Sequence, residues 1–338
     1  MRNFAQLLAD GSERAMQEYL TKHPEHLLGA FGHGFLTATV DCVIPKYRFG
    51  HEFVSDFVLL RTVSSSGYEI DLVELESPTA QPFTRLGRFA AKLNEGWQQV
   101  HDWLAWVREN QEFFLRSLLK EAYRLHPEFD PYGRMHTSFI EKPFALICAK
   151  IIIGRRRAFS TKDNARRREI QKQTRKGIEI THYDRILLAI VRIASLRGQP
   201  VAGQVALEAL GQNYAEAAPV LAYNQKLRDR RALEMLAKDS DSEIRALVAK
   251  NPHLPKGVYA RLLADQDRRV RLAAKYDSSK ARERDLIEAS SNPNEWRRAR
   301  VARNASLRDL KVLKRLAQDR SPIVRNAARR NPNWIGSS

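Results

Sequence analysis

Cysteine is scarce in this 338-residue chain and long apolar runs are missing, and each absence excludes a class of protein. The two cysteines, Cys42 and Cys148, cannot build the disulfide framework of a small secreted protein, and the first residues contain no apolar leader segment. The longest apolar patch, residues 144–153, is broken by Lys150 and is far shorter than the roughly 20 residues that cross a bilayer. We therefore expect a cytoplasmic protein with no membrane partner.

Negative charge is scarce in the second half of the chain. Residues 1–150 contain 16 Lys and Arg against 19 Asp and Glu, whereas residues 151–338 contain 41 against 20. An excess of this size favours a polyanionic partner, nucleic acid first, over a general contribution to solubility. Charge alone does not distinguish DNA from RNA.

Two short apolar runs, residues 53–60 and 68–75, flank a polar turn at residues 64–67 and predict a β-hairpin. Period-2 alternation sets Glu74 and Glu76 on one face at the end of the second strand, while Asp56 lies near the start of the first. Three converging carboxylates repel one another unless a cation lies between them, and Mg²⁺ is the usual solution. The alternative is a hairpin with acidic residues on its solvated face.

The elements around this hairpin alternate between helical and strand patterns and predict an α/β sandwich with a central mixed sheet. The expected helices are residues 12–28, 89–123, 163–176 and 182–196, and the expected strands are residues 35–44, 47–49, 143–153 and 178–181. Gln99 and Trp103 are spaced to share one face of the long second helix, so we expect them beside the carboxylates.

Several blocks in this order resemble the PD-(D/E)XK nuclease superfamily, and most closely the Shedu anti-phage defence nucleases, over about residues 12–195. The blocks are Glu18-Tyr19-Leu20 with His23-Pro24, Ser55-Asp56-Phe57-Val58, Val73-Glu74-Leu75-Glu76-Ser77-Pro78, Gln99-Val100-His101-Asp102-Trp103, Ile153-Gly154-Arg155-Arg156 and Ile178-Glu179-Ile180-Thr181-His182-Tyr183-Asp184. The resemblance implies a restriction-endonuclease-like nuclease domain over residues 1–196.

Roles for individual residues follow from the resemblance. Asp56 and Glu74 would be the ligands of Mg²⁺ or Mn²⁺, and Gln99-x-x-x-Trp103 resembles a Gln-x-x-x-Tyr motif of related nucleases. Where the superfamily usually has Lys, this chain has Glu76, which would act as a third metal ligand or as a base. Arg155 and Arg156 would grip the nucleic-acid backbone, although a solvated basic turn is the alternative. The resemblance also implies a homo-oligomer, a dimer or tetramer, and a phage-derived trigger.

The C-terminal half is repetitive. Arg245, Arg271, Arg298 and Arg325 are spaced 26, 27 and 27 residues apart, with an Asn or Asp six residues after each and an N-cap residue type four residues before each. This pattern predicts an all-α solenoid of two-helix repeats over residues 228–338, preceded by a helical linker over residues 197–227.

The repeats resemble the leucine-rich repeat variant and HEAT-like families. Some of the former hold an iron–sulfur cluster, but neither cysteine lies near the repeats, so no cluster is expected. We expect the repeated Arg to lie in an inter-repeat hydrogen-bond ladder. The variable arginines are better candidates for contact with phosphate: Arg268, Arg269, Arg297, Arg300, Arg329 and Arg330.

The sequence therefore predicts a metal-dependent DNA endonuclease of the Shedu type that acts in anti-phage defence, with a basic helical-repeat arm. Two alternatives remain open. One is a nuclease fold that has lost its chemistry and acts as a nucleic-acid-binding sensor. The other is a repeat protein whose charge recognises an acidic protein partner.

Overall fold

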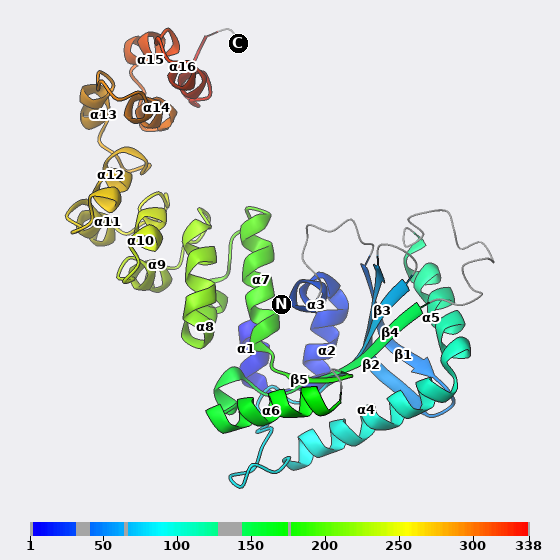
Figure 1. Ribbon diagram of the computed structural model, residues 1–338. Coiled ribbons are helices and arrows are strands. Elements are labelled where there is room, and N and C mark those ends of the chain that lie inside the picture. Colours follow the sequence, from blue (N-terminus) through cyan, green and yellow to red (C-terminus); the bar gives the residue numbers. More distant parts are fainter. Residues whose placement is uncertain (1–2, 32–40, 64–66, 128–143, 175–176, 337–338) are drawn as a thin grey trace. The chain divides into compact units, whose positions relative to one another are not determined.

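The computed structural model describes residues 3–31, 41–63, 67–127, 144–174 and 177–336 (Figure 1). The chain divides into two compact units, Met1–Ile193 and Ala194–Ser338. The predicted turn residues 64–66, residues 35–40 of a predicted strand and the end of the helix predicted to reach residue 176 lie outside the described residues. Each unit is described by itself below.

A five-stranded mixed sheet forms the centre of the first unit, with its strands in the order β1-β2-β3-β4-β5. The strands are β1 (Asp41–Phe49), β2 (Phe53–Val63), β3 (Gly67–Leu75), β4 (Phe144–Ile152) and β5 (Ile178–Thr181). The first three strands pair antiparallel, and β4 and β5 are added in parallel. The predicted hairpin and the predicted mixed sheet are thus confirmed.

Helices surround this sheet. They are α1 (Phe4–Asp10), α2 (Glu13–Lys22), α3 (Pro24–Phe31), α4 (Ala91–Glu109), α5 (Gln111–Leu125), α6 (Thr161–Gln173) and α7 (Asp184–Leu196). The helix predicted over residues 12–28 ends at Lys22, and Pro24 starts a separate helix, where proline is tolerated because its missing N–H needs no intrahelical partner.

The single long helix predicted over residues 89–123 is wrong, because Asn110 divides it into α4 and α5. Asn110 has φ −119° and ψ 30°, outside helical values, and its side-chain amide donates to the carbonyl of Trp106 at 2.9 Å. This local bond satisfies a carbonyl at the end of α4, as asparagine commonly does at helix ends. Apolar periodicity continues through the break, which is why the pattern alone did not reveal it.

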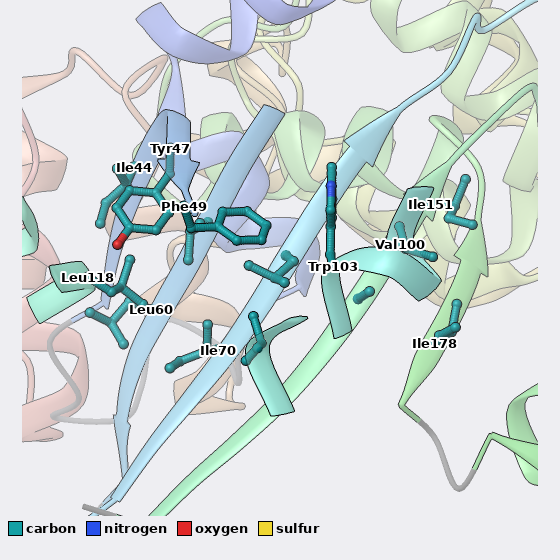
Figure 2. Close-up of a cluster of buried hydrophobic side chains, with 14 of the residues drawn as sticks. Ile44, Tyr47, Phe49, Leu60, Ile70, Val100, Trp103, Leu118, Ile151 and Ile178 are labelled. Carbon is teal, nitrogen blue, oxygen red and sulfur yellow. The ribbon is translucent and has the colours of Figure 1, made fainter. Parts of the chain in front are cut away.

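Helices α4 and α5 bury their apolar faces on one side of the sheet (Figure 2). Trp103 and Val100 of α4 lie over the strands, and Leu118 of α5 packs with Ile44 and Leu60. Trp103 is 1% exposed, and its ring meets that of Phe49 edge-on, with centroids 5.8 Å apart. The indole is thus part of the core, and α4 is fixed across the sheet at this point.

The opposite face of the sheet carries a neutralised ionic network. Arg61 donates to Asp71 at 2.8 Å, and Lys150 lies 3.3 Å from the other oxygen of Asp71. Lys150 also donates to Glu179 at 2.8 Å, and Arg185 of α7 donates to the second oxygen of Glu179 at 2.6 Å. Lys150 and Arg185 lower the pKa of Glu179 despite its burial. On this face, Asp71 and Glu179 each have two cationic partners.

The second unit is helical. It contains α8 (Gly203–Tyr223), α9 (Arg230–Leu236), α10 (Ser242–Val248), α11 (Lys256–Leu263), α12 (Arg268–Tyr276), α13 (Glu283–Ala289), α14 (Glu295–Arg303), α15 (Leu310–Ala317) and α16 (Pro322–Arg329). The segment predicted as a helical linker holds α8, which is kinked at Asn213 and belongs to the same compact unit as the helices that follow.

Repeating hydrogen bonds join successive helix pairs of this unit. Asn251 donates through its amide to the carbonyls of Asn224 and Leu227, both at 3.1 Å. Asn304 and Asn331 make the same kind of bond to carbonyls 26 to 29 residues earlier. The predicted N-cap residues cap α10, α12 and α14 through their side chains. Ser321 stands at the N-cap of α16, before Pro322, but its side chain makes no capping hydrogen bond. The structure therefore repeats with the period read from the sequence.

None of the helices in the described parts of the chain combines the length and the apolar character that a membrane crossing requires.

Candidate metal centre

Strand register brings two predicted site residues together. Phe57 of β2 pairs with Val73 of β3, so the next antiparallel step places Asp56 opposite Glu74. On the other side of β2, Lys46 of β1 lies opposite Asp56, between the pairs formed by its chain neighbours. Alternation sets Asp56 and Glu74 on the sheet face that α4 covers, and the Lys46 side chain reaches Asp56. A row of Lys, Asp and Glu thus crosses three strands.

Asp56 is held at both carboxylate oxygens. Oδ1 accepts a hydrogen bond from Lys46 Nζ at 2.5 Å, and Oδ2 accepts one from the backbone N–H of Leu75 at 2.8 Å. Lys46 has φ 47° and is the one non-glycine residue of the described chain with a left-handed backbone. That conformation costs roughly 1–2 kcal/mol for an L-residue. The backbone is thus strained at Lys46, the residue whose ammonium group contacts Asp56. Strain of this kind is a common feature of functional sites.

Glu76 is fixed beyond the end of β3 by its backbone. Its N–H donates to the carbonyl of Ile152 at 2.9 Å, and its own carbonyl accepts from the buried hydroxyl of Tyr183 at 2.8 Å. Glu76 is 4% exposed, and its Oε2 has no hydrogen-bond donor among the described residues. An ionised oxygen in this position is costly, and a cation would compensate it.

Helix α4 approaches Glu76 at a glycine. A Cβ on Gly96 would lie 3.0 Å from Glu76 Oε1 and 3.4 Å from the side chain of Ile151. Only a residue without a side chain fits this contact without displacing the carboxylate. Gly96 therefore lets the helix backbone serve as one wall of the site.

The electrostatics of the row differ from those of the opposite face. Burial, followed by the charges of Asp56 and Glu76, raises the pKa of Glu74 to about 9. Burial, followed by the charge of Glu13, raises the pKa of Glu76 to about 7. The carboxyls of Glu74 and Glu76 are thus under-neutralised, whereas Glu179 on the other face is stabilised as an anion.

Two residues that sequence reasoning missed complete the surroundings. Lys92 of α4 lies 3.8 Å from Glu76 Oε2, 3.9 Å from Glu13 of α2 and 3.2 Å from Glu95. Lys92 precedes Gly96 by four residues, so the two share a helix face, and this spacing is the signal that would have indicated it. For Glu13, nothing in the local sequence distinguishes it from an acidic residue that favours a helix N-terminus.

Gln99 lies on the expected helix but without a contact to the carboxylates. It is half-buried on α4, seven residues after Lys92 and therefore on nearly the same face. The structure gives it no hydrogen bond to the described carboxylates. Its predicted neighbour Trp103 belongs to the hydrophobic core, so the pair does not form the joint site element that was expected.

The donor set fits a hard divalent cation, because Asp56, Glu74 and Glu76 offer carboxylate oxygens, and the carboxyls of Glu74 and Glu76 are under-neutralised. They do not form a closed cage. Within the described residues, the group whose three ligating atoms lie within 4.8 Å of one another is His23, Glu25 and His26. The two histidines of that group pack against the ring of Tyr19 at the junction of α2 and α3, and Glu25 lies 3.6 and 3.8 Å from their ring nitrogens.

Arg155 and Arg156 were predicted to contact the nucleic-acid backbone, and the structure contradicts this prediction for Arg155. Arg155 is 6% exposed, and its Nε and Nη2 donate to Asp184, the latter at 2.6 Å. A guanidinium paired in this way has no open edge for a phosphate, so Arg155 anchors the turn after β4 to α7 instead. The side chain of Arg156 is exposed, while its backbone N–H donates to Asp184 at 2.6 Å.

The variable arginines of the second unit also divide into engaged and open groups. Arg300 forms a bidentate ion pair with Asp277, and Arg269 donates to Ser242 Oγ at 2.9 Å and to Asp267 at 3.4 Å. The others have no ion pair within the described part of the chain: Arg268, Arg329 and Arg330 are exposed, and Arg297 is half-buried. These four remain open to a ligand.

Comparison with known proteins identifies the family of the chain. A search of curated proteins gave no match. The family model described as "Shedu protein SduA, C-terminal" matches residues 10–187, just over half of the chain, and this range includes the carboxylate row and every strand of the sheet. The chain belongs to the Shedu family, which is associated with anti-phage defence.

Proposed function

We propose that this protein is a metal-dependent DNA endonuclease that acts in anti-phage defence. The observation that carries the proposal is the contrast between the two faces of one sheet. Asp71 and Glu179 have cationic partners on both oxygens, whereas Glu74 and Glu76 are buried beside Asp56 with pKa values raised to about 9 and about 7. Under-neutralised buried carboxyls are typical of functional sites.

Asp56 and Glu74 would hold the ion, and Glu76 would be its third ligand or the base that accepts a proton from water. Mg²⁺ bound there would neutralise phosphate charge and activate water. Lys46 would orient Asp56 before binding, through its 2.5 Å hydrogen bond. Its ammonium group also supplies positive charge to a row in which the usual Lys is replaced by Glu76.

A second candidate is a nucleic-acid-binding protein of the same family without cleavage activity. It is favoured by one observation, that both oxygens of Asp56 are already engaged, by Lys46 and by the N–H of Leu75. In this case Lys46 substitutes for a metal rather than preparing a site for one.

Two measurements on the full chain separate the candidates. The first is cleavage of supercoiled and linear DNA with Mg²⁺, Mn²⁺ or EDTA. The second is calorimetric titration with Mn²⁺ in the absence of DNA. The nuclease proposal requires metal-dependent cleavage and metal binding, both lost in Glu74→Gln and both retained in Glu234→Gln, which neutralises a half-buried carboxylate of α9 paired with Arg230. A chain that binds no metal and cleaves no DNA favours the second candidate.

A further inference from the structure

The repeated arginine of the second unit has one job that is common to the four repeats. One guanidinium nitrogen, Nη1, donates to the carbonyls five and six residues before it. In the first repeat, Arg245 bonds the carbonyls of Asp239 and Ser240 at 2.7 and 3.0 Å. Arg271, Arg298 and Arg325 repeat this bond. This edge of the guanidinium holds the loop between the two helices of its own repeat.

The other edge, formed by Nε and Nη2, binds a carboxylate of the following repeat. Arg245 donates to Asp265 at 2.8 and 2.9 Å, and Arg298 donates to Asp319 at 2.7 and 2.8 Å. Arg245 and Arg298 are each 6% exposed. The fork of this arginine is therefore shaped and positioned to take an oxyanion with two parallel hydrogen bonds.

Arg271 keeps the hydrogen bonds to the loop carbonyls but lacks a carboxylate partner in the following repeat. The position equivalent to Asp265 and Asp319 is Asn292, whose Oδ1 accepts the N–H of Asn294 at 3.0 Å, as the aspartates accept theirs. Arg271 is exposed, and its Nε and Nη2 have no acceptor within the described residues. An oxyanion-binding fork is thus left open in the second repeat.

The neighbours of Arg271 on the same helix face are also cationic. Arg268 precedes it by three residues and Lys275 follows it by four, so the three line one face of α12. The equivalent places are Ser242 and Ala249 around Arg245, and Glu295 and Ala302 around Arg298. Around Arg325 of the fourth repeat the same places hold Pro322 and Arg329, so all three places are cationic in the second repeat alone. Neither Arg268 nor Lys275 forms an ion pair with the described residues.

This face of α12 is open because the helix of the next repeat does not pack against it. Helix α10 packs on α12, and α14 packs on α16, but α12 makes no comparable contact with α14. Ala249 and Ala302, which stand in the place of Lys275, are fully buried. The C-terminal end of α12 stays attached, since Asn304 donates to the carbonyls of Tyr276 and Ser278.

We propose that the open face of α12, formed by Arg268, Arg271 and Lys275, binds the phosphate backbone of nucleic acid. Like charges at this spacing repel one another on a free helix, and successive phosphates relieve that repulsion. The planar fork of Arg271 grips one phosphate in the way its sister residues grip a carboxylate. The inference rests on the nucleic-acid-binding part of the proposed function and not on cleavage.

The test measures DNA binding by the full chain through the fluorescence anisotropy of a labelled duplex. EDTA is present, so that metal-dependent cleavage cannot occur. Arg271→Gln is expected to weaken binding about tenfold and to reduce the slope of log affinity against log salt by about one. Arg231→Gln removes the same charge from an exposed position of α9 and serves as the matched control. Unchanged affinity and slope in Arg271→Gln would overturn the inference.

Asn292→Asp gives an independent test because it places a carboxylate where Asp265 and Asp319 stand in the other repeats, opposite the guanidinium of Arg271. It is expected to raise the melting temperature and to weaken DNA binding as much as Arg271→Gln does, with no further loss in the double variant. Asn294→Asp adds the same charge at an N-cap two residues away and is expected to weaken binding less. Equal losses in the two Asp variants would show a general charge effect and argue against the site.

Inorganic phosphate distinguishes the ligand. If phosphate raises the melting temperature of the wild type but not of Arg271→Gln, while DNA binding is the same in both, the fork takes another anion and the nucleic-acid assignment fails. Absence of cleavage with normal, Arg271-dependent DNA binding would instead count against the nuclease proposal and leave this inference standing.

Discussion

The Cβ that Gly96 lacks would stand 3.0 Å from Oε1 of Glu76, so the backbone of α4 and this carboxylate are in direct contact. A methyl group at this place would require the carboxylate to shift by a few tenths of an ångström. The contact makes Gly96 a residue of the site although it has no chemistry of its own, and it leads to the first prediction.

Gly96→Ala should weaken Mn²⁺ binding about tenfold or more, because Glu76 is displaced from its position against the helix. Gly257→Ala is the matched control, since its Cβ would meet nothing within 4 Å. Gly257 lies in the first turn of α11, where the preference for alanine over glycine is less than the roughly 1 kcal/mol of a helix interior, so the control should melt at nearly the same temperature and bind metal normally. Normal metal affinity in Gly96→Ala would remove Glu76 from the ligand set.

Stability should depend on pH through Glu74. Its folded pKa of about 9 lies above the ordinary value of 4.5, so the folded state binds this proton more tightly than the unfolded chain. The contribution is fully present below about pH 4.5 and is lost as pH rises toward 9. Without metal, the melting temperature should therefore fall between pH 6 and pH 9, and Glu74→Gln should flatten this part of the profile.

Saturating Mg²⁺ should oppose that loss, because the ion compensates the charge that appears when the proton leaves. Differential scanning calorimetry with and without Mg²⁺ measures both effects. A flat wild-type profile over this range would contradict the burial and crowding assigned to Glu74.

Glu76→Lys separates two interpretations of the residue that departs from the pattern of the nuclease superfamily that the sequence resembles. If Glu76 is a third ligand, the substitution places a cation in an anionic pocket and should lower metal affinity and cleavage by at least tenfold. We expect this outcome, since Asp56 and Glu74 are also present and Lys92 already lies 3.8 Å from Oε2. Cleavage rates across a Mg²⁺ titration provide the measurement. A variant faster than the wild type at saturating metal would indicate that Glu76 stands in a decayed site.

Residues 1–196 should fold without the remainder of the chain, since the first compact unit ends at Ile193 and contains the whole sheet. This truncated protein should bind DNA more weakly and with a smaller salt slope, because fewer phosphates are neutralised. Circular dichroism checks the fold and anisotropy checks the binding. A salt slope equal to that of the full chain would point to an acidic protein as the partner of the repeats.

Asn251→Ala should destabilise the second unit by about 2 kcal/mol, because the carbonyls of Asn224 and Leu227 lose their donor in a buried loop. Asn333→Ala is a useful comparison, since its amide bonds lie closer to the surface. Chemical denaturation of the full chain reports the difference. Equal stability of Asn251→Ala and the wild type would mean that water replaces the ladder bond.

The sequence predicted much of the fold because the strands around Asp56 and Glu74 are short, apolar and bounded by turn residues. It also predicted the repeat period, since the caps and the Arg–carbonyl bonds are local. It missed the break at Asn110, where apolar periodicity continues across a non-helical residue. Arg155 was misjudged because the sequence shows its charge but not Asp184, its partner 29 residues away.

Sequence reasoning brought together only those carboxylates that share a strand or face each other in a hairpin. Lys46 and Lys92 were missed because their relevance depends on a strand pairing and on a helix crossing that no local pattern records. The repeats show the same limit. The Asp-to-Asn change at position 292 becomes informative only when the bidentate bonds made by Arg245 and Arg298 are known.

The row formed by Lys46, Asp56 and Glu74 exists only when β1, β2 and β3 are paired in one register, because each strand supplies a single member. A slip of one residue in β2 would turn Asp56 to the side of the sheet that holds Arg61 and Asp71. Any ion that binds the row therefore stabilises the correct strand register over the alternatives, since its ligands meet only in that pairing. Metal affinity would in this way report the correct assembly of the sheet before any substrate is present.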